Sequence, residues 1–263
     1  MLPHLQECMV LLIGHRGFRV GVVENTLQAF SLAVARGMDY IELDVQLSAD
    51  HEVFVLHDAS LDRTMGVTGQ LAELTASQVD AFNATRGDAG VPRLLDVFER
   101  VLLPSSPAAR PRLMVELKGA GTGIATGKLV MARHVEDVVV FSGKDLRELA
   151  AAHETAPRVP LCLNITSCKE FTKKQLVEAS CIADLPLPFA MISLRAREVG
   201  KEFIHACHRL GARALAWDFV RERRPADALE RLVRQGLDGA LIDDPAMVEE
   251  SRSRILHALG SPG

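Results

Sequence analysis

Short apolar runs rich in β-branched residues alternate with longer amphipathic segments along the whole chain. Runs that are apolar at nearly every position are typical of parallel strands covered on both faces. The pattern predicts eight such strands, at Val10–Gly14, Tyr40–Val45, Arg112–Leu117, Asp137–Phe141, Val159–Leu163, Phe189–Ser193, Ala212–Ala216 and Gly239–Ile242.

Helical patterns occupy the segments between these strands. Examples lie at Asn25–Arg36, Lys144–His153, Thr172–Ile182, Arg197–Leu210 and Pro225–Gln235. Pro225 stands where a first helical turn tolerates proline, and Gly211 and Gly236 stand where helices commonly end. Eight strand–helix units in series favour an α/β fold, a closed (β/α)8 TIM barrel, over an open doubly wound sheet.

One spacing departs from this regular series. Most predicted strands begin 22 to 30 residues after the previous one, but the starts at residues 40 and 112 are 72 apart. The excess holds an extended run at Glu52–Leu56, a turn-rich stretch from His57 to Gly90, a helix near Leu94–Leu102 and a connection at Pro104–Pro111. We interpret residues 58–90 as a small insertion after the second strand, within a single barrel domain over residues 1–263.

Composition and charge narrow the classes of function. The chain has 263 residues with 30 Lys and Arg against 34 Asp and Glu, a formal net charge of −4 that gives no broad attraction to nucleic acid. Its five cysteines are odd in number and show no CxxC spacing, which favours reduced thiols. The apolar run Met9–Ile13 is too short for a signal peptide or a membrane span. We therefore expect a cytoplasmic protein with a small-molecule substrate, no membrane anchor and no nucleic-acid partner.

Titratable residues gather where the predicted strands end, which is the functional face of a barrel. His15 and Arg16 follow the first strand, and His57 and Asp58 follow the extended run after the second. A single histidine at a strand end is more often structural than catalytic. The case for chemistry therefore rests on what accompanies these histidines.

Three carboxylates accompany them. Glu42 and Asp44 are two residues apart on the second strand, so both point to the same face, and Glu116 lies on the next barrel strand. Inward carboxylates repel one another and are costly to desolvate unless a cation lies between them. Hard divalent cations take such an all-oxygen ligand set. The sequence thus predicts a site for Mg²⁺ or Ca²⁺ at Glu42, Asp44 and Glu116.

Two basic residues lie beside the predicted metal site. Lys118 shares a strand face with Glu116, and Arg16 follows the first strand. With a metal present they supply more positive charge than the carboxylates need, so they suit a bound phosphate. The glycine-rich segment Gly119–Gly123 is interpreted as a flexible loop rather than a phosphate cradle.

The order of these residues resembles the glycerophosphodiester phosphodiesterase family, whose motif is HR, then E-x-D, then HD. Further segments extend the resemblance over nearly the whole chain: Glu24–Phe30 (ENTLQAF), His57–Thr64 (HDASLDRT), Val115–Lys118 (VELK), Ala216–Trp217 (AW), Gly236–Gly239 (GLDG) and Asp243–Pro245 (DDP). Val23 and Arg93 depart from the family's usual proline and threonine, and residues 120–210 carry few landmarks. These departures concern substrate preference rather than the core chemistry.

The resemblance implies metal-dependent hydrolysis of glycerophosphodiesters to glycerol 3-phosphate and an alcohol. Glu42, Asp44 and Glu116 would hold Mg²⁺, Ca²⁺ or Mn²⁺, and Arg16 and Lys118 would bind the phosphate.

The two histidines and the only tryptophan complete the implied site. His15 and His57 would share the roles of general base and general acid, in an order that the sequence leaves open, with Asp58 orienting a histidine or the loop. Trp217 would flank the glycerol pocket, although plain packing explains it equally well.

Two other functions remain open at this point. A lysophospholipase D acting on lipid phosphodiesters shares these residues, but Ala59–Gly90 is mostly small and polar, which disfavours a lipid site. A non-catalytic phosphate-binding barrel is the second alternative, and the retention of every motif residue weighs against it.

Overall fold

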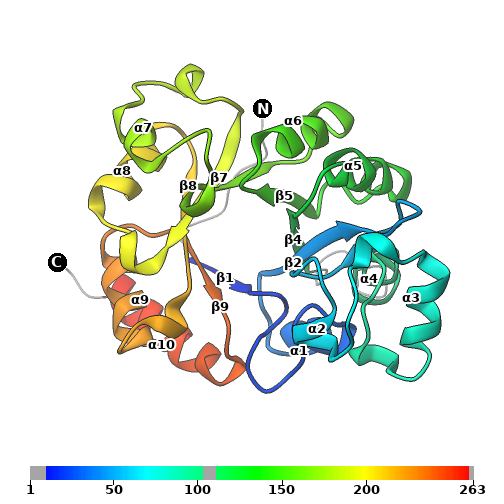
Figure 1. The fold of residues 1–263 in the computed structure, drawn as a ribbon. Coiled ribbons are helices and arrows are strands. Elements are labelled where there is room, and N and C mark those ends of the chain that lie inside the picture. Colours follow the sequence, from blue (N-terminus) through cyan, green and yellow to red (C-terminus); the bar gives the residue numbers. More distant parts are fainter. Residues whose placement is uncertain (1–9, 103–110, 261–263) are drawn as a thin grey trace.

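Eight parallel strands form a closed barrel in the computed structural model, which describes residues 10–102 and 111–260 (Figure 1). The barrel closes because β1 pairs with both β2 and β9. Its strands are β1 (Leu11–Gly14), β2 (Tyr40–Leu47), β4 (Arg112–Leu117), β5 (Val139–Gly143), β6 (Leu161–Asn164), β7 (Phe189–Arg195), β8 (Arg213–Trp217) and β9 (Gly239–Ile242). The predicted TIM barrel is confirmed, and every predicted strand end lies within two residues of the observed one.

Helices surround the strands (Figure 1). They are α1 (Leu27–Ala35), α5 (Thr122–Arg133), α6 (Leu146–Thr155), α7 (Lys173–Glu178), α8 (Lys201–Arg209), α9 (Pro225–Arg234) and α10 (Val248–Gly260). Two predicted helices are shorter than expected, since α7 ends before Ala179 and α8 begins at Lys201 after a 3-10 turn. Thr172 and Gln175 form the capping box that starts α7.

The glycine-rich segment after β4 begins a helix. The flexible loop predicted for Gly119–Gly123 is wrong at its end, because Gly123 lies in the first turn of α5. The backbone N–H groups of Gly121 and Gly123 donate to the Glu148 carboxylate at 2.9 and 2.8 Å. A Cβ at residue 123 would lie 2.2 Å from the Glu148 carbonyl oxygen, so only glycine allows α5 to pack this close to α6.

The segment between β2 and β4, which includes residues 58–90, has an apolar cluster of its own. Its elements are β3 (Val53–Val55), antiparallel to β2, and the helices α2 (Asp62–Met65), α3 (Ala76–Asn83) and α4 (Leu94–Val97), the last continued by a π-helical turn (Phe98–Leu102). The buried cluster contains Phe54, Leu56, Leu61, Met65, Leu71, Ala76, Val79 and Val91. Val53, Val55 and the buried apolar residues from Leu94 to Leu102 belong instead to the main core of the barrel. The stretch predicted to be rich in turns also contains α2 and α3.

Each barrel strand contributes one side chain to an apolar ring inside the barrel. The ring consists of Ile13, Tyr40, Met114, Val140, Cys162, Met191, Leu215 and Leu241. Because side chains alternate between the two faces of a strand, the residue two positions later on each strand points to the interior again. Those residues form a second, polar ring: His15, Glu42, Glu116, Ser142, Asn164, Ser193, Trp217 and Asp243. The apolar ring thus fills the barrel, and the polar ring lies above it at the carboxyl ends of the strands.

The described cysteines form no disulfide bond. Cys162, Cys168, Cys181 and Cys207 are free, whereas Cys8 and nearly all of the connection at Pro104–Pro111 lie outside the described residues. Within residues 10–102 and 111–260, no helix has the length and apolar character needed to cross a membrane.

Candidate active site

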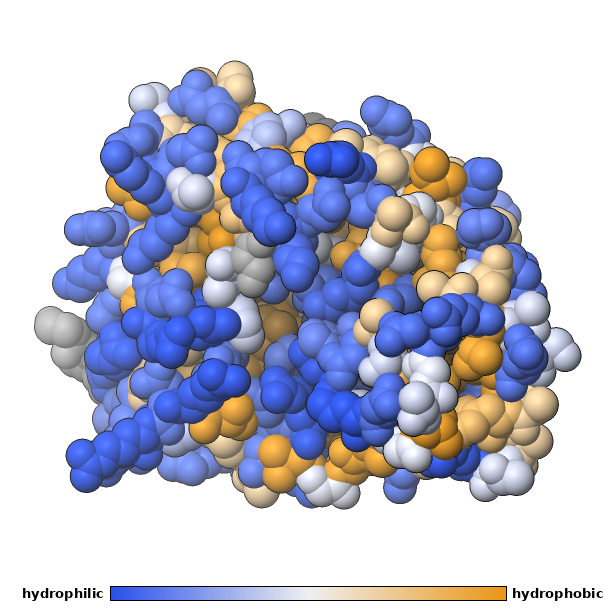
Figure 2. Space-filling view, in the orientation of Figure 1, coloured by the Kyte–Doolittle hydropathy of each residue, from blue (hydrophilic) through white to orange (hydrophobic). Residues whose placement is uncertain are grey.

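The polar ring lines a pocket at the mouth of the barrel. Seven of its eight members line a cavity of about 130 Å³, together with Arg16, His57, Lys118, Lys144 and two apolar residues of the ring below, Met114 and Leu241. Figure 2 shows a hollow over the strands that is bordered mainly by hydrophilic residues. Every residue predicted for catalysis, metal binding or phosphate binding lies in or beside this pocket, although these residues are spread from His15 to Lys118 along the sequence.

Glu42, Asp44 and Glu116 form a buried carboxylate cluster. One oxygen from each lies within 4.8 Å of the others, and Asp44 and Glu116 are direct neighbours across the β2–β4 pairing. Glu42 Oε1 and Asp44 Oδ1 are buried and accept no hydrogen bond from the described part of the chain, although Lys118 Nζ lies 3.1 Å from Asp44 Oδ1. Unpaired buried carboxylate oxygens are costly, and a divalent cation would supply the missing ligand bonds. The donor set therefore fits such an ion.

The two acids on β2 have opposite electrostatic surroundings. Burial, together with the charges of Asp44 and Glu116, raises the pKa of Glu42 well above its ordinary value. Burial would also raise the pKa of Asp44, but the nearby charges of Lys118 and Arg16 outweigh it and hold that pKa well below the usual range. Of the two acids on β2, Glu42 is thus the one whose negative charge is less compensated by nearby cations.

Lys118 and Arg16 contact these carboxylates directly. Lys118 Nζ lies 2.7 Å from Glu116 Oε1, and Arg16 Nε lies 3.2 Å from Asp44 Oδ2. Burial lowers the pKa of Lys118, but Asp44 and Glu116 more than offset it, so the pKa is raised and the amine stays charged. Both cations are therefore held at the pocket, where an anionic ligand would meet them.

The turn after β1 positions Arg16 through its backbone. Arg16 has a φ of 56° and Gly17 a φ of 74°, a left-handed pair that turns the chain sharply. The Arg16 N–H donates to Glu42 Oε2 at 2.8 Å. A Cβ at residue 17 would lie 2.7 Å from the Ala29 carbonyl carbon, so the turn requires glycine. The sequence His-Arg-Gly thus forms a turn that places the Arg16 N–H against the carboxylate cluster.

Each histidine has a carboxylate partner. His15 Nδ1 lies 2.7 Å from Asp243 Oδ1, and His57 Nδ1 lies 2.6 Å from Asp58 Oδ1. Such contacts fix the ring orientation and leave Nε2 of each imidazole for another partner. Burial lowers the pKa of His57, and Lys118 acts in the same direction, which favours the neutral imidazole.

Trp217 both packs and lines the pocket. Its Nε1–H donates to Thr166 Oγ1 at 3.2 Å, and its ring lies edge-on to His15 with centroids 6.4 Å apart. The guanidinium of Arg195 covers the ring at 4.9 Å from its centroid. The two interpretations of the sequence, pocket wall and packing residue, therefore both describe this side chain.

Sequence reasoning missed a set of residues that support the site. Asn25 Nδ2 donates to Asp44 Oδ2 at 2.8 Å, and Gln46 Nε2 donates to backbone carbonyls of the His57–Asp58 loop. Glu24 Oε1 pairs with Arg16 and Arg63, each at 2.6 Å. Asn25 and Glu24 belong to the ENT motif and Arg63 to the DRT motif, so the motifs already indicated that these three residues are functionally important. Their individual roles depend on contacts between distant segments.

Comparisons with known proteins identify relatives of this chain. The model of the glycerophosphoryl diester phosphodiesterase family matches residues 15–247. A glycerophosphodiester phosphodiesterase of Caldanaerobacter subterraneus is 27% identical over 248 residues, which cover 89% of this chain and 94% of that protein. A lysophospholipase D of Rattus norvegicus is 33% identical over 107 residues, covering 36% of this chain and 33% of that protein.

Solved structures share the fold. A glycerophosphodiester phosphodiesterase of Agrobacterium tumefaciens superposes with a TM-score of 0.74 at 23% identity, over 93% of this chain and 100% of that one. An Oleispira antarctica phosphodiesterase, solved in complex with the product sn-glycerol-3-phosphate, gives a TM-score of 0.73 at 20% identity, over 95% and 97%. The match of the family model from His15, at the end of β1, to Met247, beyond β9, takes in the whole pocket. The chain therefore belongs to the glycerophosphoryl diester phosphodiesterase family.

Proposed function

We propose that this chain hydrolyses glycerophosphodiesters to glycerol 3-phosphate and an alcohol with the help of a divalent metal ion. The observation that carries the proposal is the convergence of three buried carboxylates, two carboxylate-paired imidazoles and two basic side chains at one barrel mouth. Support also comes from the relative of Oleispira antarctica, whose structure holds sn-glycerol-3-phosphate. A barrel that only binds phosphate has no need for two such imidazoles.

The metal would be held by Glu42, Asp44 and Glu116. Their all-oxygen set suits Mg²⁺ or Ca²⁺, with Mn²⁺ as a further candidate. Bound there, the ion would supply Lewis-acid stabilisation of the charge on the phosphate oxygens.

Arg16 and Lys118 would neutralise the non-bridging oxygens of the phosphodiester. Charge on those oxygens needs support in the transition state of phosphoryl transfer, and both side chains already lie at the pocket with raised pKa values. Trp217 would form the wall against which the glycerol or the alcohol packs.

His57 and His15 would move the protons. The lowered pKa of His57 favours a neutral imidazole that accepts a proton from the nucleophile, water or a substrate hydroxyl. His15, held by Asp243, would then protonate the departing alcohol oxygen. The carboxylates of Asp58 and Asp243 would keep the two rings oriented.

A panel of glycerophosphodiesters tests the proposal. The protein is incubated with choline, ethanolamine, serine, inositol and glycerol diesters in the presence of Mg²⁺, Ca²⁺ or Mn²⁺, and release of glycerol 3-phosphate is measured. Activity should vanish after exhaustive chelation and return when metal is added. Full activity without metal would remove the metal role of the three carboxylates, and no release from any diester would refute the function.

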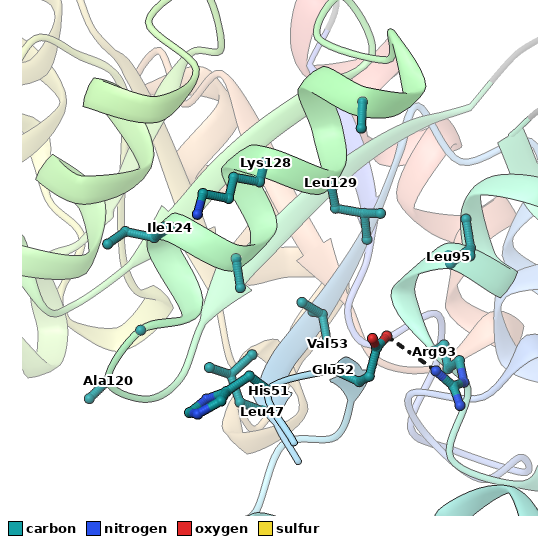
Figure 3. Close-up of a pocket in the computed structure, with 13 residues that line it drawn as sticks. Leu47, His51, Glu52, Val53, Arg93, Leu95, Ala120, Ile124, Lys128 and Leu129 are labelled. Atoms are coloured by element: carbon teal, nitrogen blue, oxygen red, sulfur yellow. Dashed lines mark hydrogen bonds and ion pairs between the residues drawn. The ribbon is translucent and has the colours of Figure 1, made fainter. Parts of the chain in front are cut away.

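Lysophospholipase D activity is the second candidate, because a lysophospholipase D of Rattus norvegicus matches part of the chain. A groove of about 650 Å³ between α5 and the β2–β3 hairpin offers apolar surface, and Figure 3 shows Ile124 and Leu129 on its α5 side. This groove and the mouth pocket share no lining residue. The groove therefore gives no direct support for an acyl chain next to the reacting phosphate, and we favour water-soluble, deacylated diesters.

The remaining expectations belong to the same proposal. We propose one domain in which residues 58–90 belong to the barrel's second unit, and a cytoplasmic site of action, for which the odd cysteine number without CxxC spacing is the support. The net charge of −4 supports a small-molecule substrate rather than a nucleic acid.

A further inference from the structure

We propose that Lys144 selects diesters whose alcohol carries a negatively charged group, a carboxylate or a phosphate, over those whose alcohol carries only a positive charge. The proposal rests on the proposed function and names the substrate class for the same site. Lys144 lines the pocket, and the proposed mechanism gives it no role.

Strand periodicity places Lys144 at the rim of the pocket. Val140 belongs to the apolar ring and Ser142 to the polar ring, so Lys144, one residue beyond the end of β5, continues the inward series. Lys118 holds the corresponding position after β4, two residues beyond Glu116. Lys144 is exposed and lines the pocket, and the next residue, Asp145, caps α6 by accepting the Arg147 N–H. The lysine thus extends from a fixed helix start, outside the carboxylate cluster.

Lys144 differs from the other cations near the pocket in having no carboxylate partner. Arg16 pairs with Glu24 and Asp44, and Lys118 pairs with Glu116 and Asp44. Arg195, on the β7 side of the pocket, pairs with Glu198 and Asp218. Among the residues that the structure describes, the Lys144 amine has neither an ion pair nor a hydrogen bond.

This difference leaves one positive charge for the alcohol part of the substrate. The three carboxylates and the phosphodiester together carry four negative charges, and a divalent ion, Lys118 and Arg16 together supply four positive charges. Lys144 then has no counter-charge inside the pocket. An anionic group on the leaving alcohol would supply it, whereas an ammonium group alone would be repelled.

The aromatic residues of the pocket also disfavour an alcohol that carries only a quaternary ammonium group. Quaternary ammonium groups are commonly recognised by several aromatic faces that surround the cation. Of the residues in ranges 10–102 and 111–260, Trp217 is the only Phe, Tyr or Trp that lines this pocket, and the Arg195 guanidinium covers its ring at 4.9 Å from the centroid. The described residues therefore form no aromatic cage for choline here.

Two diesters that differ by one carboxylate test the proposal. Glycerophosphoserine and glycerophosphoethanolamine share the ammonium and the chain length, and the serine diester adds the carboxylate. With full-length protein and Mg²⁺, kcat/KM for the serine diester should exceed that for the ethanolamine diester. Lys144→Gln should lower this ratio about threefold to fivefold, the scale of an exposed ion pair. Lys144→Arg should keep the ratio, Lys144→Glu should lower it further, and 0.5 M NaCl should weaken it in the wild type.

Lys128→Gln is the matched control. Lys128 is an exposed lysine of α5 that lines the separate groove of Figure 3, so its loss removes one surface charge away from the mouth pocket. The ratio should stay at the wild-type value in this variant. A wild-type ratio of one or less, an unchanged ratio in Lys144→Gln, or an equal fall in Lys128→Gln would overturn the role of Lys144. Release of glycerol 3-phosphate from neither diester would instead refute the proposed function, and this inference with it.

Discussion

Replacing Glu42 by glutamine should stabilise the metal-free protein while it abolishes metal binding. The three carboxylates of the site are buried, with one oxygen of each within 4.8 Å of the others. At 4.8 Å and an effective dielectric constant of about 20, two like charges repel by roughly 3.5 kcal/mol. Burial, Asp44 and Glu116 together raise the pKa of Glu42, so without a metal its charged form opposes folding. Glutamine keeps the shape and removes the charge.

The increase in the free energy of unfolding has an upper limit, because the folded wild-type protein can remove the charge of Glu42 by binding a proton. For a carboxyl with an unfolded pKa of about 4.3, that proton costs at most roughly 4 kcal/mol at pH 7.5. We expect Glu42→Gln to raise the free energy of unfolding by about 2–4 kcal/mol at pH 7.5 in chelator, a Tm increase of about 5–10 °C.

The sign of the pH dependence follows from the raised pKa. The destabilisation by Glu42 is absent below the unfolded pKa, grows as the pH rises toward the folded pKa, and is constant above it. The stability difference between variant and wild type should therefore vanish near pH 4 and increase toward neutral pH.

Thermal unfolding monitored by circular dichroism measures these effects. Wild-type protein should be stabilised by added Mg²⁺ or Ca²⁺, by about 2.7 kcal/mol at a hundredfold excess over Kd, and the variant should not respond. Glu24→Gln is the matched control, a buried acid whose pKa is lowered because its bonds to Arg63 and Arg16 outweigh burial. This variant should lose about 1–3 kcal/mol. If both variants shift in the same direction in chelator, or if Glu42→Gln is no more stable than wild type at pH 7.5, the electrostatic reasoning is wrong.

Three further predictions concern catalysis and substrate. His15→Ala and His57→Ala should each lower kcat by about 10²-fold while metal still raises Tm, and a folded His57→Ala variant with wild-type kcat would remove His57 from the mechanism. Asp243→Asn should lower kcat with little change in KM, because Asp243 orients His15 rather than the substrate, and a change in KM alone in steady-state kinetics would contradict that role. Glycerophosphoethanolamine should be hydrolysed with a higher kcat/KM than its long-chain lysophospholipid counterpart, and the reverse order would favour the lysophospholipase D function.

Much of the fold could be predicted because the barrel strands are continuous apolar runs. Such a run predicts a strand by itself, as at Gly239–Ile242, where prediction and structure coincide. The helix α5 was not recognised because Gly121, Gly123 and Gly127 resemble loop residues when neighbours in space are unknown. Gly123 and Gly127 are needed for the approach to α6, since a Cβ at either would lie within 3.0 Å of residues on that helix. A close contact between two helices is a tertiary interaction, so local helix propensity cannot predict it.

The insertion shows the same limit. Its large apolar residues are sparse along the sequence, so Ala59–Gly90 looked like a polar, turn-rich segment. In the structure Leu61, Met65 and Leu71 pack with Phe54 and Leu56 into one buried cluster. Spacing along the chain did not reveal this cluster, because short helices and turns bring its members together without a fixed period.

The site was easier to predict by residue type than by contact. The two-residue period of a strand is enough to place Glu42 with Asp44, and Glu116 with Lys118, on inward faces, and the closed barrel then brings them together. Which side chains of the site pair with one another depends on how the loops pack in three dimensions. Asp243 reaches His15 only because β9 pairs with β1 across 228 residues of sequence, and Arg16 reaches Glu24 only because a left-handed turn follows β1. The same period that produces the predicted metal ligands also carries Lys144 to the rim, so its place follows from β5 alone. The inferred selectivity depends on the absence of a carboxylate partner for Lys144 among the described residues. Only the three-dimensional structure shows that absence.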